Sequence, residues 1–344
     1  VLHLTCRVNK EVVNQKGERV PQSVLPLSEK VRENADYLLH SDHPLPCRDF
    51  IAEMDQRLIR FWLDDLSLER LERKCEEINS HLQRFNHSWD EVFYVILSRN
   101  FGFGLNSRPF ELLALSLPLN YILRHNDDLS MIEALLFGQA GLLEDSELND
   151  PYYRRLQSDY RFLSTKYGLR CMEGFLFRKM RIRPYSFPHV RIAQLASLLQ
   201  HSGRLFSTVL ETENPVRLME LFRYEPSGYW STHYSFVTES PKTTKSLGDA
   251  SLEILLINTV AFILFAYGRS TDREECCERA LRLLHTLKPE RNAMVDTFRE
   301  VGIQPANASD SQALIQLRKE YCDRKKCLYC RIGNTLLTSP EINQ

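Results

Sequence analysis

The chain has 344 residues, which is long enough for two domains or for one large domain. Its 44 Lys and Arg residues balance 45 Asp and Glu residues, which gives a net charge of -1. The overall charge therefore indicates no binding partner. The 13 glycines and 15 prolines are about 8% of the chain, below the roughly 12% of average proteins, which argues against a loop-rich β-sandwich and favours helices.

Residues 1–27 are predicted to form a β-hairpin or two edge strands. The opening VLHLTCRV alternates apolar and polar positions, and Gly17 lies in the turn-like run NQKGE. Two strands alone are marginally stable, and the chain begins in a strand with Val1 rather than Met. We therefore expect sheet partners upstream of residue 1, and an exposed edge that recruits a second copy of the chain.

Residues 28–344 are predicted to form one irregular helical domain without a fixed repeat. Ser28 is placed to cap a short helix, which the proline-bearing loop SDHPLPC ends. Apolar residues then recur from Ala52 to Arg84 at the spacing of a long amphipathic helix or a helix pair. The later predicted helices are Trp89–Asn100 capped by Ser88, one opened by Asn106 or Ser107, Leu129–Leu143 opened by Asp128, Tyr152–Tyr167, Pro188–Gln200, Pro215–Phe222, Leu252–Tyr267, Glu274–Leu287, Arg291–Val301 and Gln312–Tyr321; Ser231–Thr238 is a short strand or an ordered loop.

Cysteine usage and hydropathy indicate a reducing compartment, which we take to be the cytoplasm. The nine cysteines are an odd number, and Cys276 and Cys277 are adjacent, which suits free thiols better than a disulfide framework. The longest apolar stretch, Ile254–Tyr267, has 14 residues and is shorter than the roughly 20 that span a bilayer. It is predicted to be a buried helix, so we expect no membrane partner.

The most specific motif is a C-x4-C-x2-C run formed by Cys322, Cys327 and Cys330. Thiolates are soft ligands, so a short turn that gathers three of them is typical of a zinc site, and the same local spacing occurs in plant-type ferredoxins. Zinc is preferred over an iron–sulfur cluster, because nothing else in the chain indicates redox chemistry. Cys47 is the first candidate for the fourth ligand, with Cys6 or a histidine as alternatives. The competing interpretation is a set of reduced thiols in a C-terminal tail.

The second motif is a cationic segment, FLFRKMRIRPYSFPHVR, that precedes a predicted helix at Pro188. Guanidinium groups and a helix N-terminus attract phosphate, and aromatic rings stack on the bases of single-stranded nucleic acid. The candidate phosphate or nucleic-acid ligands are Arg178, Lys179, Arg181, Arg183 and Arg191. In the competing interpretation these side chains pair with carboxylates such as Glu144, Asp145 or Glu173, and the segment is purely structural.

Several stretches, among them PCRDF, SRNFGFGLN, FGQAGLL, RIRPYSFPHVRIAQLA and CDRKKCLYCRIG, resemble a bacterial family of unknown function, domain-of-unknown-function family 2851. Its members are longer at the N-terminus, where they carry an acidic pattern similar to restriction-endonuclease-like nucleases. The resemblance implies that the N-terminal hairpin here is left over from an upstream α/β, nuclease-like domain. It assigns no catalytic residue to positions 1–344.

Two functional hypotheses follow. In the first, the chain takes part in nucleic-acid processing, with the nuclease-like core upstream and the helical body gripping phosphate through the cationic segment. In the second, it is a non-catalytic helical interaction or scaffold protein. Binding to single- and double-stranded DNA and RNA at low salt separates them, because phosphate-driven binding falls steeply as salt rises.

Overall fold

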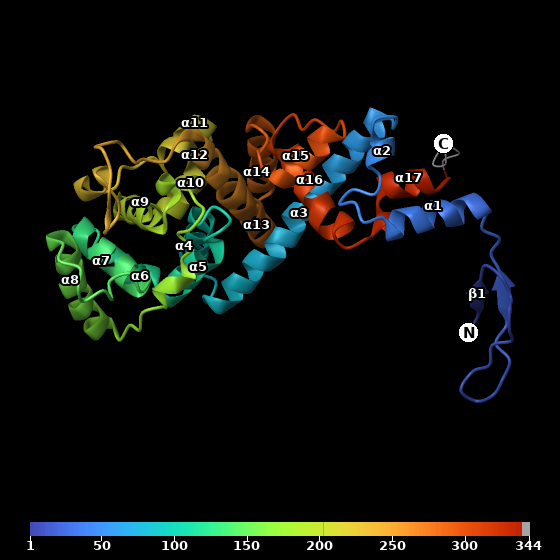
Figure 1. Cartoon of the computed structure of the whole chain (residues 1–344), viewed down its shortest axis with the longest axis horizontal. Coiled ribbons are helices and arrows are strands. Elements are labelled where there is room, and N and C mark those ends of the chain that lie inside the picture. The colour runs from blue at the N-terminus through green and yellow to red at the C-terminus, as the bar shows by residue number, and fades with distance from the viewer. Residues whose placement is uncertain (202, 339–344) are drawn as a thin grey trace. The chain divides into compact units, whose positions relative to one another are not determined.

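The computed structural model describes residues 1–201 and 203–338, and Figure 1 shows that the chain is built mostly from helices. Helices hold 62% of the residues and strands 4%, so the prediction of a mainly α chain is confirmed. The chain divides into two compact units, residues 1–70 with the segment from residue 289 onward, and residues 71–288. Residues 1–27 belong to the first unit, and the domain boundary at residue 27 stays a prediction.

The N-terminal segment contains two short strands, β1 (His3–Thr5) and β2 (Gln22–Val24), which pair in parallel. The predicted antiparallel hairpin is limited to the turn between them, where Val13 pairs with Arg19 and Gly17 adopts a φ of 79°. The chain reverses direction twice between β1 and β2, and this is why the two strands run the same way.

Both strands carry exposed apolar side chains. Leu4 of β1 is 55% exposed and Val24 of β2 is 48% exposed. The sheet has two strands, which leaves unpaired backbone groups along its outer edges. Recruitment of another chain by these edges stays a prediction.

The first unit packs residues from both of its sequence segments around one core. Leu38, Trp62 and Leu314 come from three different helices and are at most 7% exposed. The buried Asn34 side chain donates from Nδ2 to the Leu336 carbonyl at 3.1 Å and so joins the first helix to the last. The helices of this unit are α1 (Glu29–His40), α2 (Arg48–Ile51), residues 56–70 of α3 (Gln56–Arg84), α15 (Ala293–Glu300), α16 (Ala308–Gln316), the π-helical η5 (Leu317–Cys322), the 3₁₀ turn η6 (Cys327–Tyr329) and α17 (Arg331–Thr338).

Polar side chains line the contact between α3 and α16, which lie side by side in Figure 1. The hydroxyls of Ser67 and Ser309 bond at 2.7 Å, and Arg60 pairs with the buried Asp310 at 2.7 Å. Burying these groups is tolerable only because each has a partner. The pairs therefore fix the register of α16 on α3.

The second unit is an irregular helical body around α7 and α9, whose side chains are buried on nearly all sides. Its helices are residues 71–84 of α3, α4 (Trp89–Phe101), α5 (Ser107–Ser116), α6 (Leu119–Leu123), α7 (Leu129–Gln139), α8 (Pro151–Tyr167), α9 (Pro188–His201), α10 (Leu205–Glu211), α11 (Pro215–Glu220), α12 (Asp249–Leu255), α13 (Phe262–Thr271) and α14 (Glu274–Thr286). Shorter elements are the 3₁₀ turns η1 (Gly174–Leu176), η2 (Pro184–Ser186) and η3 (Gly228–Ser231), the π-helical η4 (Leu256–Ala261), and the strands β3 (His233–Ser235) and β4 (Thr238–Glu239).

Three of the predicted helix caps, Ser28, Ser88 and Asp128, are present where the sequence placed them. The Ser28 hydroxyl accepts from the Val31 amide at 3.2 Å, and the Asp128 carboxylate accepts from the Ser130 amide at 2.9 Å. These caps satisfy backbone donors that the first helical turn leaves without partners. The short helices α6, α10 and α17 were not predicted, because they have only five, seven and eight residues.

The apolar stretch predicted to be a buried helix is part of a longer helix. α12, η4 and α13 run continuously from Asp249 to Thr271, and among the described residues this helix alone is long and apolar enough to cross a membrane. Its most apolar window is 67% buried inside the structure. The prediction underestimated its length, because its ends are polar while its centre packs in the core.

Gly138 lets α7 approach α8 closely. A Cβ atom at this position would lie 2.0 Å from the Tyr160 ring, far inside van der Waals contact. Tyr160 also donates from its hydroxyl to the Gln139 side chain at 3.0 Å, so displacing the ring would break a hydrogen bond as well. This contact explains why glycine stands in the last turn of α7, although glycine destabilises a helix.

We predict that Gly138→Ala lowers the free energy of unfolding by about 1–3 kcal/mol, because the overpacking outweighs the gain in helix propensity. Gly228→Ala is the matched control, since a Cβ there meets no atom within 4 Å. Urea unfolding followed by circular dichroism measures both. Equal stabilities of the two variants would contradict the close packing.

Candidate functional site

The cationic segment runs along the surface of the second unit from η1 to the start of α9. The buried Asn106 side chain holds it in place, because Nδ2 donates to the Arg178 carbonyl at 3.0 Å and Oδ1 accepts from the Arg178 amide at 2.8 Å. Asn106 or Ser107 is predicted to open α5; the helix begins at Ser107, and the Asn106 side chain caps no helix amide. Its amide group is occupied by Arg178 instead.

Of the five predicted cationic ligands, Arg191 is only partly exposed and turns inward, whereas Lys179 is exposed. Arg191 lies with its guanidinium carbon 4.1 Å from the centre of the Phe103 ring and donates to Gln194 at 3.1 Å. Burial lowers the pKa of Arg191 to about 10 and also lowers the pKa of Lys179. Burial lowers the pKa of His189, and the positive charge of Lys179 lowers it further. The sequence does not show that the Arg191 side chain turns inward, because its direction depends on the packing around α9 and α5.

The other three cationic ligands, Arg178, Arg181 and Arg183, are exposed. Within the described part of the chain, none of their guanidinium groups forms an ion pair, so the carboxylates considered as structural partners do not neutralise them. Arg181 also adopts a φ of 60°, which is uncommon for a residue with a side chain. The three arginines therefore present uncompensated positive charge to solvent.

A pocket of about 740 Å³ opens beside this segment. Two of its three acidic residues are engaged locally: Asp145 accepts from two amides of its own turn, and Glu144 accepts from the Cys171 thiol at 3.1 Å. These bonds leave the arginine charges unpaired while placing carboxylates a short distance away. The polar and flexible side chains that line the pocket are Glu144, Asp145, Glu173, Arg178, Lys179 and Met180.

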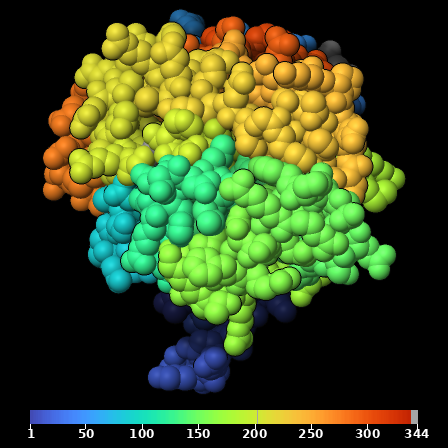
Figure 2. All heavy atoms as spheres, turned by 90° about the vertical axis from the view of Figure 1, so that its left-hand side faces the viewer, coloured from blue at the N-terminus to red at the C-terminus, as the bar shows by residue number. Residues whose placement is uncertain are grey.

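Apolar side chains project from the same stretch. Phe175 is 79% exposed and Met180 is 83% exposed, and both line the pocket. Tyr185 is half exposed, and its ring packs edge-on against Tyr234 at 5.3 Å. The yellow-green atoms of this stretch are visible on the face of the second unit drawn in Figure 2. Exposed aromatic side chains between unpaired arginines are the composition that binds single-stranded nucleic acid.

Sequence reasoning missed a buried carboxylate in the second unit. Glu133 of α7 is fully buried and accepts from Trp230 Nε1 at 3.0 Å and from the Tyr152 hydroxyl. Burial raises its pKa to about 8, and the hydrogen bonds from Ser227 and Trp230 offset only part of this effect. The sequence feature that could have indicated it is a single acidic residue within the apolar run MIEALLFG. The residue ties α7 to the segment 227–230, which makes it a structural acid rather than a surface ligand.

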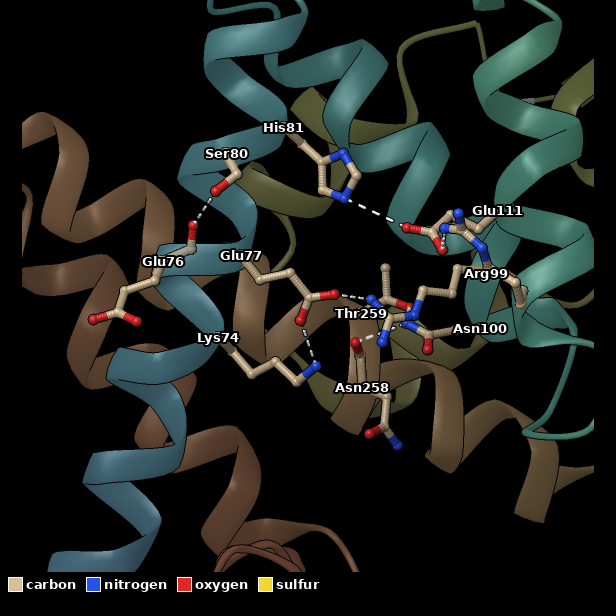
Figure 3. Close-up of polar contacts among 11 residues, drawn as sticks. Lys74, Glu76, Glu77, Ser80, His81, Arg99, Asn100, Glu111, Asn258 and Thr259 are labelled. Carbon is tan, nitrogen blue, oxygen red and sulfur yellow. Dashed lines mark hydrogen bonds and ion pairs between the residues drawn. The ribbon is translucent and has the colours of Figure 1, made fainter. Parts of the chain in front are cut away.

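A second polar cluster, shown in Figure 3, joins α3 to α4 and η4 within the second unit. Glu77 accepts from Lys74 at 2.6 Å and also pairs with Arg99. Asn100 donates from Nδ2 to the Asn258 carbonyl at 2.8 Å. That carbonyl belongs to η4, where π-helical geometry disturbs the regular bonding of the helix. The cluster provides a hydrogen-bond donor to a carbonyl of the irregular helix, and its charged side chains neutralise one another.

The same cluster continues onto α5, where Glu111 pairs with Arg108 at 2.8 Å and lies 3.6 Å from His81. Burial lowers the pKa of His81 more than the carboxylate raises it, so the imidazole is held neutral at physiological pH. A neutral imidazole beside an already paired carboxylate gives no general acid and base at a common site. We assign this cluster to packing.

The four predicted metal ligands lie together in the first unit. Cys327 and Cys330 are buried in its core, and Cys47 and Cys322 pack against that core. Burial raises the pKa of Cys47 to about 12, with further contributions from Cys330 and Cys327. Burial also raises the pKa of Cys322, followed by the effects of Cys47, Cys330 and Cys327. Cys6, the alternative fourth ligand, is exposed on the N-terminal segment.

These four thiols share one core, but they are not arranged around a common point. Over residues 1–201 and 203–338, no group of three or more His, Cys, Asp or Glu side chains has the arrangement of an assembled metal centre. Side-chain rotation would have to draw the sulfurs inward before all four could coordinate one ion.

A family model described as Protein of unknown function (DUF2851) matches residues 1–293. The chain belongs to the DUF2851 family. The match includes the cationic segment and Cys47, and it ends before the three C-terminal cysteines. Comparison with curated proteins and with solved structures finds no match. The chemistry of this DUF2851 protein therefore has to be argued from its own residues.

The first prediction from this geometry concerns pH. The folded-state pKa of Glu133 lies above its unfolded value of roughly 4.3, so between these values the unfolded state binds fewer protons and stability falls as pH rises. We predict that, between pH 5 and pH 8, the free energy of unfolding of wild type falls by about 2–4 kcal/mol relative to that of Glu133→Gln. Urea unfolding at each pH measures it, and a pH-independent difference would contradict the raised pKa.

The second prediction concerns the inward arginine. Arg191→Glu should lose about 3 kcal/mol of stability or more, because it buries a carboxylate against the Phe103 ring. Arg191→Met should stay within about 1 kcal/mol of wild type, because it keeps most of the buried stem. Arg181→Glu is the exposed control, expected within about 0.5 kcal/mol. If Arg191→Glu proved as stable as Arg181→Glu, Arg191 would belong to the surface after all.

Proposed function

We propose that this DUF2851 protein binds single-stranded nucleic acid through the exposed part of the cationic segment, as the binding module of a nucleic-acid-processing protein. The observation that carries the proposal is that Arg178, Arg181 and Arg183 are exposed and form no ion pair in the described part of the chain. Unpaired guanidinium groups are suited to bidentate contacts with phosphate oxygens.

The aromatic and flexible apolar side chains favour single strands over duplexes. Phe175 and Met180 are largely exposed beside the arginines, where a splayed base could stack or pack. Bases within a duplex are already stacked on one another and do not offer their faces. The pocket of about 740 Å³ beside Phe175 is large enough to take a nucleobase with part of its sugar.

The acidic residues of the pocket limit what can enter it. Glu144 and Asp145 line the pocket and repel phosphate there. The backbone of the ligand is therefore expected to follow Arg181 and Arg183 outside the pocket, with a base directed inward. The proposal assigns no catalysis to residues 1–344.

The test is fluorescence anisotropy with labelled single-stranded DNA, single-stranded RNA and duplex DNA at several salt concentrations. Wild type should bind single strands more tightly than the duplex, and the affinity should fall steeply with salt. Arg181→Glu/Arg183→Glu should weaken binding at least about tenfold without changing stability, and Phe175→Ala should weaken single-strand binding by about 1–3 kcal/mol.

The matched control is Arg217→Glu/Arg282→Glu, which makes the same change in net charge at exposed arginines of α11 and α14. It should stay within about twofold of wild type. Equal losses in both double variants would mean that only overall charge matters. Absence of salt-dependent binding in wild type would leave the alternative, a helical interaction or scaffold protein.

A further inference from the structure

The thiol cluster of the first unit draws its four members from distant parts of the sequence. Cys47 stands at the N-terminus of α2, Cys322 ends η5, Cys327 opens η6, and Cys330 precedes α17. About 270 residues separate Cys47 from the other three. All nine cysteines of the chain are free thiols, so no disulfide explains why these four meet.

A tight turn joins Cys327, whose thiol donates to the Leu38 carbonyl at 3.7 Å, to Cys330. The Cys330 amide donates to the Cys327 carbonyl at 3.2 Å, which closes the turn. A Cβ at Gly333 would lie 2.1 Å from the Cys327 carbonyl oxygen, so only glycine lets α17 begin this close to the turn. The tight approach brings the first amides of α17 to the Cys330 sulfur.

N–H donors converge on that sulfur. The amides of Ile332 and Gly333 and the indole N–H of Trp62 all favour the Cys330 thiolate and act against the effect of burial on its pKa. Trp62 is 7% exposed, and its buried Nε1 has no hydrogen-bond partner of normal geometry among the described residues. Leaving a buried donor unsatisfied costs about 1–3 kcal/mol, and a thiol is a weak acceptor. A metal-bound thiolate is the acceptor that this arrangement lacks.

Nearby cations suit a negatively charged centre. Arg318 lowers the pKa of Cys322 and Lys325 lowers that of Cys327, although burial dominates both. Lys325 is anchored there, because its ammonium donates to the Ser41 carbonyl at the end of α1. Arg331 lies with its guanidinium carbon 5.1 Å from the centre of the Trp62 ring. Arg318 and Arg331 are already paired with Asp323 and Asp65. Four thiolates around a divalent ion carry a net charge of about -2, which Lys325 offsets in part.

We propose that the first unit binds one zinc ion through the sulfurs of Cys47, Cys322, Cys327 and Cys330. Four thiols release four protons to solvent as four sulfur–zinc bonds of about 2.3 Å form, and no electron is transferred. The ion replaces loose packing of four thiols with a tetrahedral centre and gives the converging N–H donors a charged acceptor. The site is structural, because four protein ligands leave no open position. The inference is independent of nucleic-acid binding by the second unit.

The zinc centre would bind the C-terminal segment to the start of the helical body. α17 already packs on α1 and on η6, and the ion adds a cross-link between α2 and these elements. A cross-link between points so far apart in the chain removes much conformational freedom from the unfolded state. Loss of the ion should therefore loosen residues 289–338 before it affects the second unit.

The experiment uses the full chain purified without chelator. Elemental analysis should find about one zinc per chain, and zinc chloride added to chelator-treated protein should release protons and restore the thermal midpoint. Cobalt chloride added in place of zinc should give the intense visible bands of a tetrahedral cobalt–thiolate centre. Cys327→Ser and Cys330→Ser should each lose most of the zinc, whereas Cys75→Ser, at a buried thiol of the second unit, should keep it.

Trp62→Phe keeps an aromatic ring in the core but removes the indole N–H. It therefore tests the site even if the serine variants fail to fold. It should still bind zinc, about 10–100-fold more weakly. Three results would overturn the proposal: little zinc that added zinc chloride does not increase, iron together with inorganic sulfide, or full zinc occupancy in both serine variants. Unchanged zinc affinity in Trp62→Phe would show that the Trp62 N–H does not stabilise the Cys330 thiolate.

Discussion

The first unit depends on the return of residues 289–338 to the helices at the beginning of the chain. Trp62 is the side chain on which this return centres, because it packs edge-on against Tyr321, lies under Arg331 and directs its indole N–H at Cys330. Apolar burial supplies the attraction, and the polar pairs between α3 and α16 set the register. The meeting of the four thiols is a consequence of this closure.

The second unit shows how a buried helix pair decides which charges remain on the surface. α7 and α9 are enclosed on nearly all sides, so the chain that leads into α9 has an inner and an outer face. Arg191 falls on the inner face and is held by Phe103, while Arg181 and Arg183 fall on the outer face. One cationic segment is thus divided into a packing part and a part that solvent and ligands can reach.

Much of the fold could be predicted from local signals. Ser28, Ser88 and Asp128 mark helix starts because a side-chain oxygen can satisfy backbone amides within one turn, and the structure places helices after all three. Asn106 shows where such signals stop. It stands at a helix start, but its side chain bonds the Arg178 backbone 72 residues away instead. A long-range partner can outcompete a local one, and the sequence does not record which partner wins.

The sequence by itself determined the helical class, the helical character of the stretch that contains α3, the free state expected of the cysteines and the composition of both candidate sites. Only the tertiary structure decided that β1 and β2 run parallel, that Arg191 turns inward, that Glu133 is a buried acid and that Cys47 packs against the same core as the other three thiols. The physical reason is the range of the interactions. Capping and periodicity act over a few residues, whereas burial, the direction of a side chain and the proximity of distant thiols depend on segments tens to hundreds of residues apart.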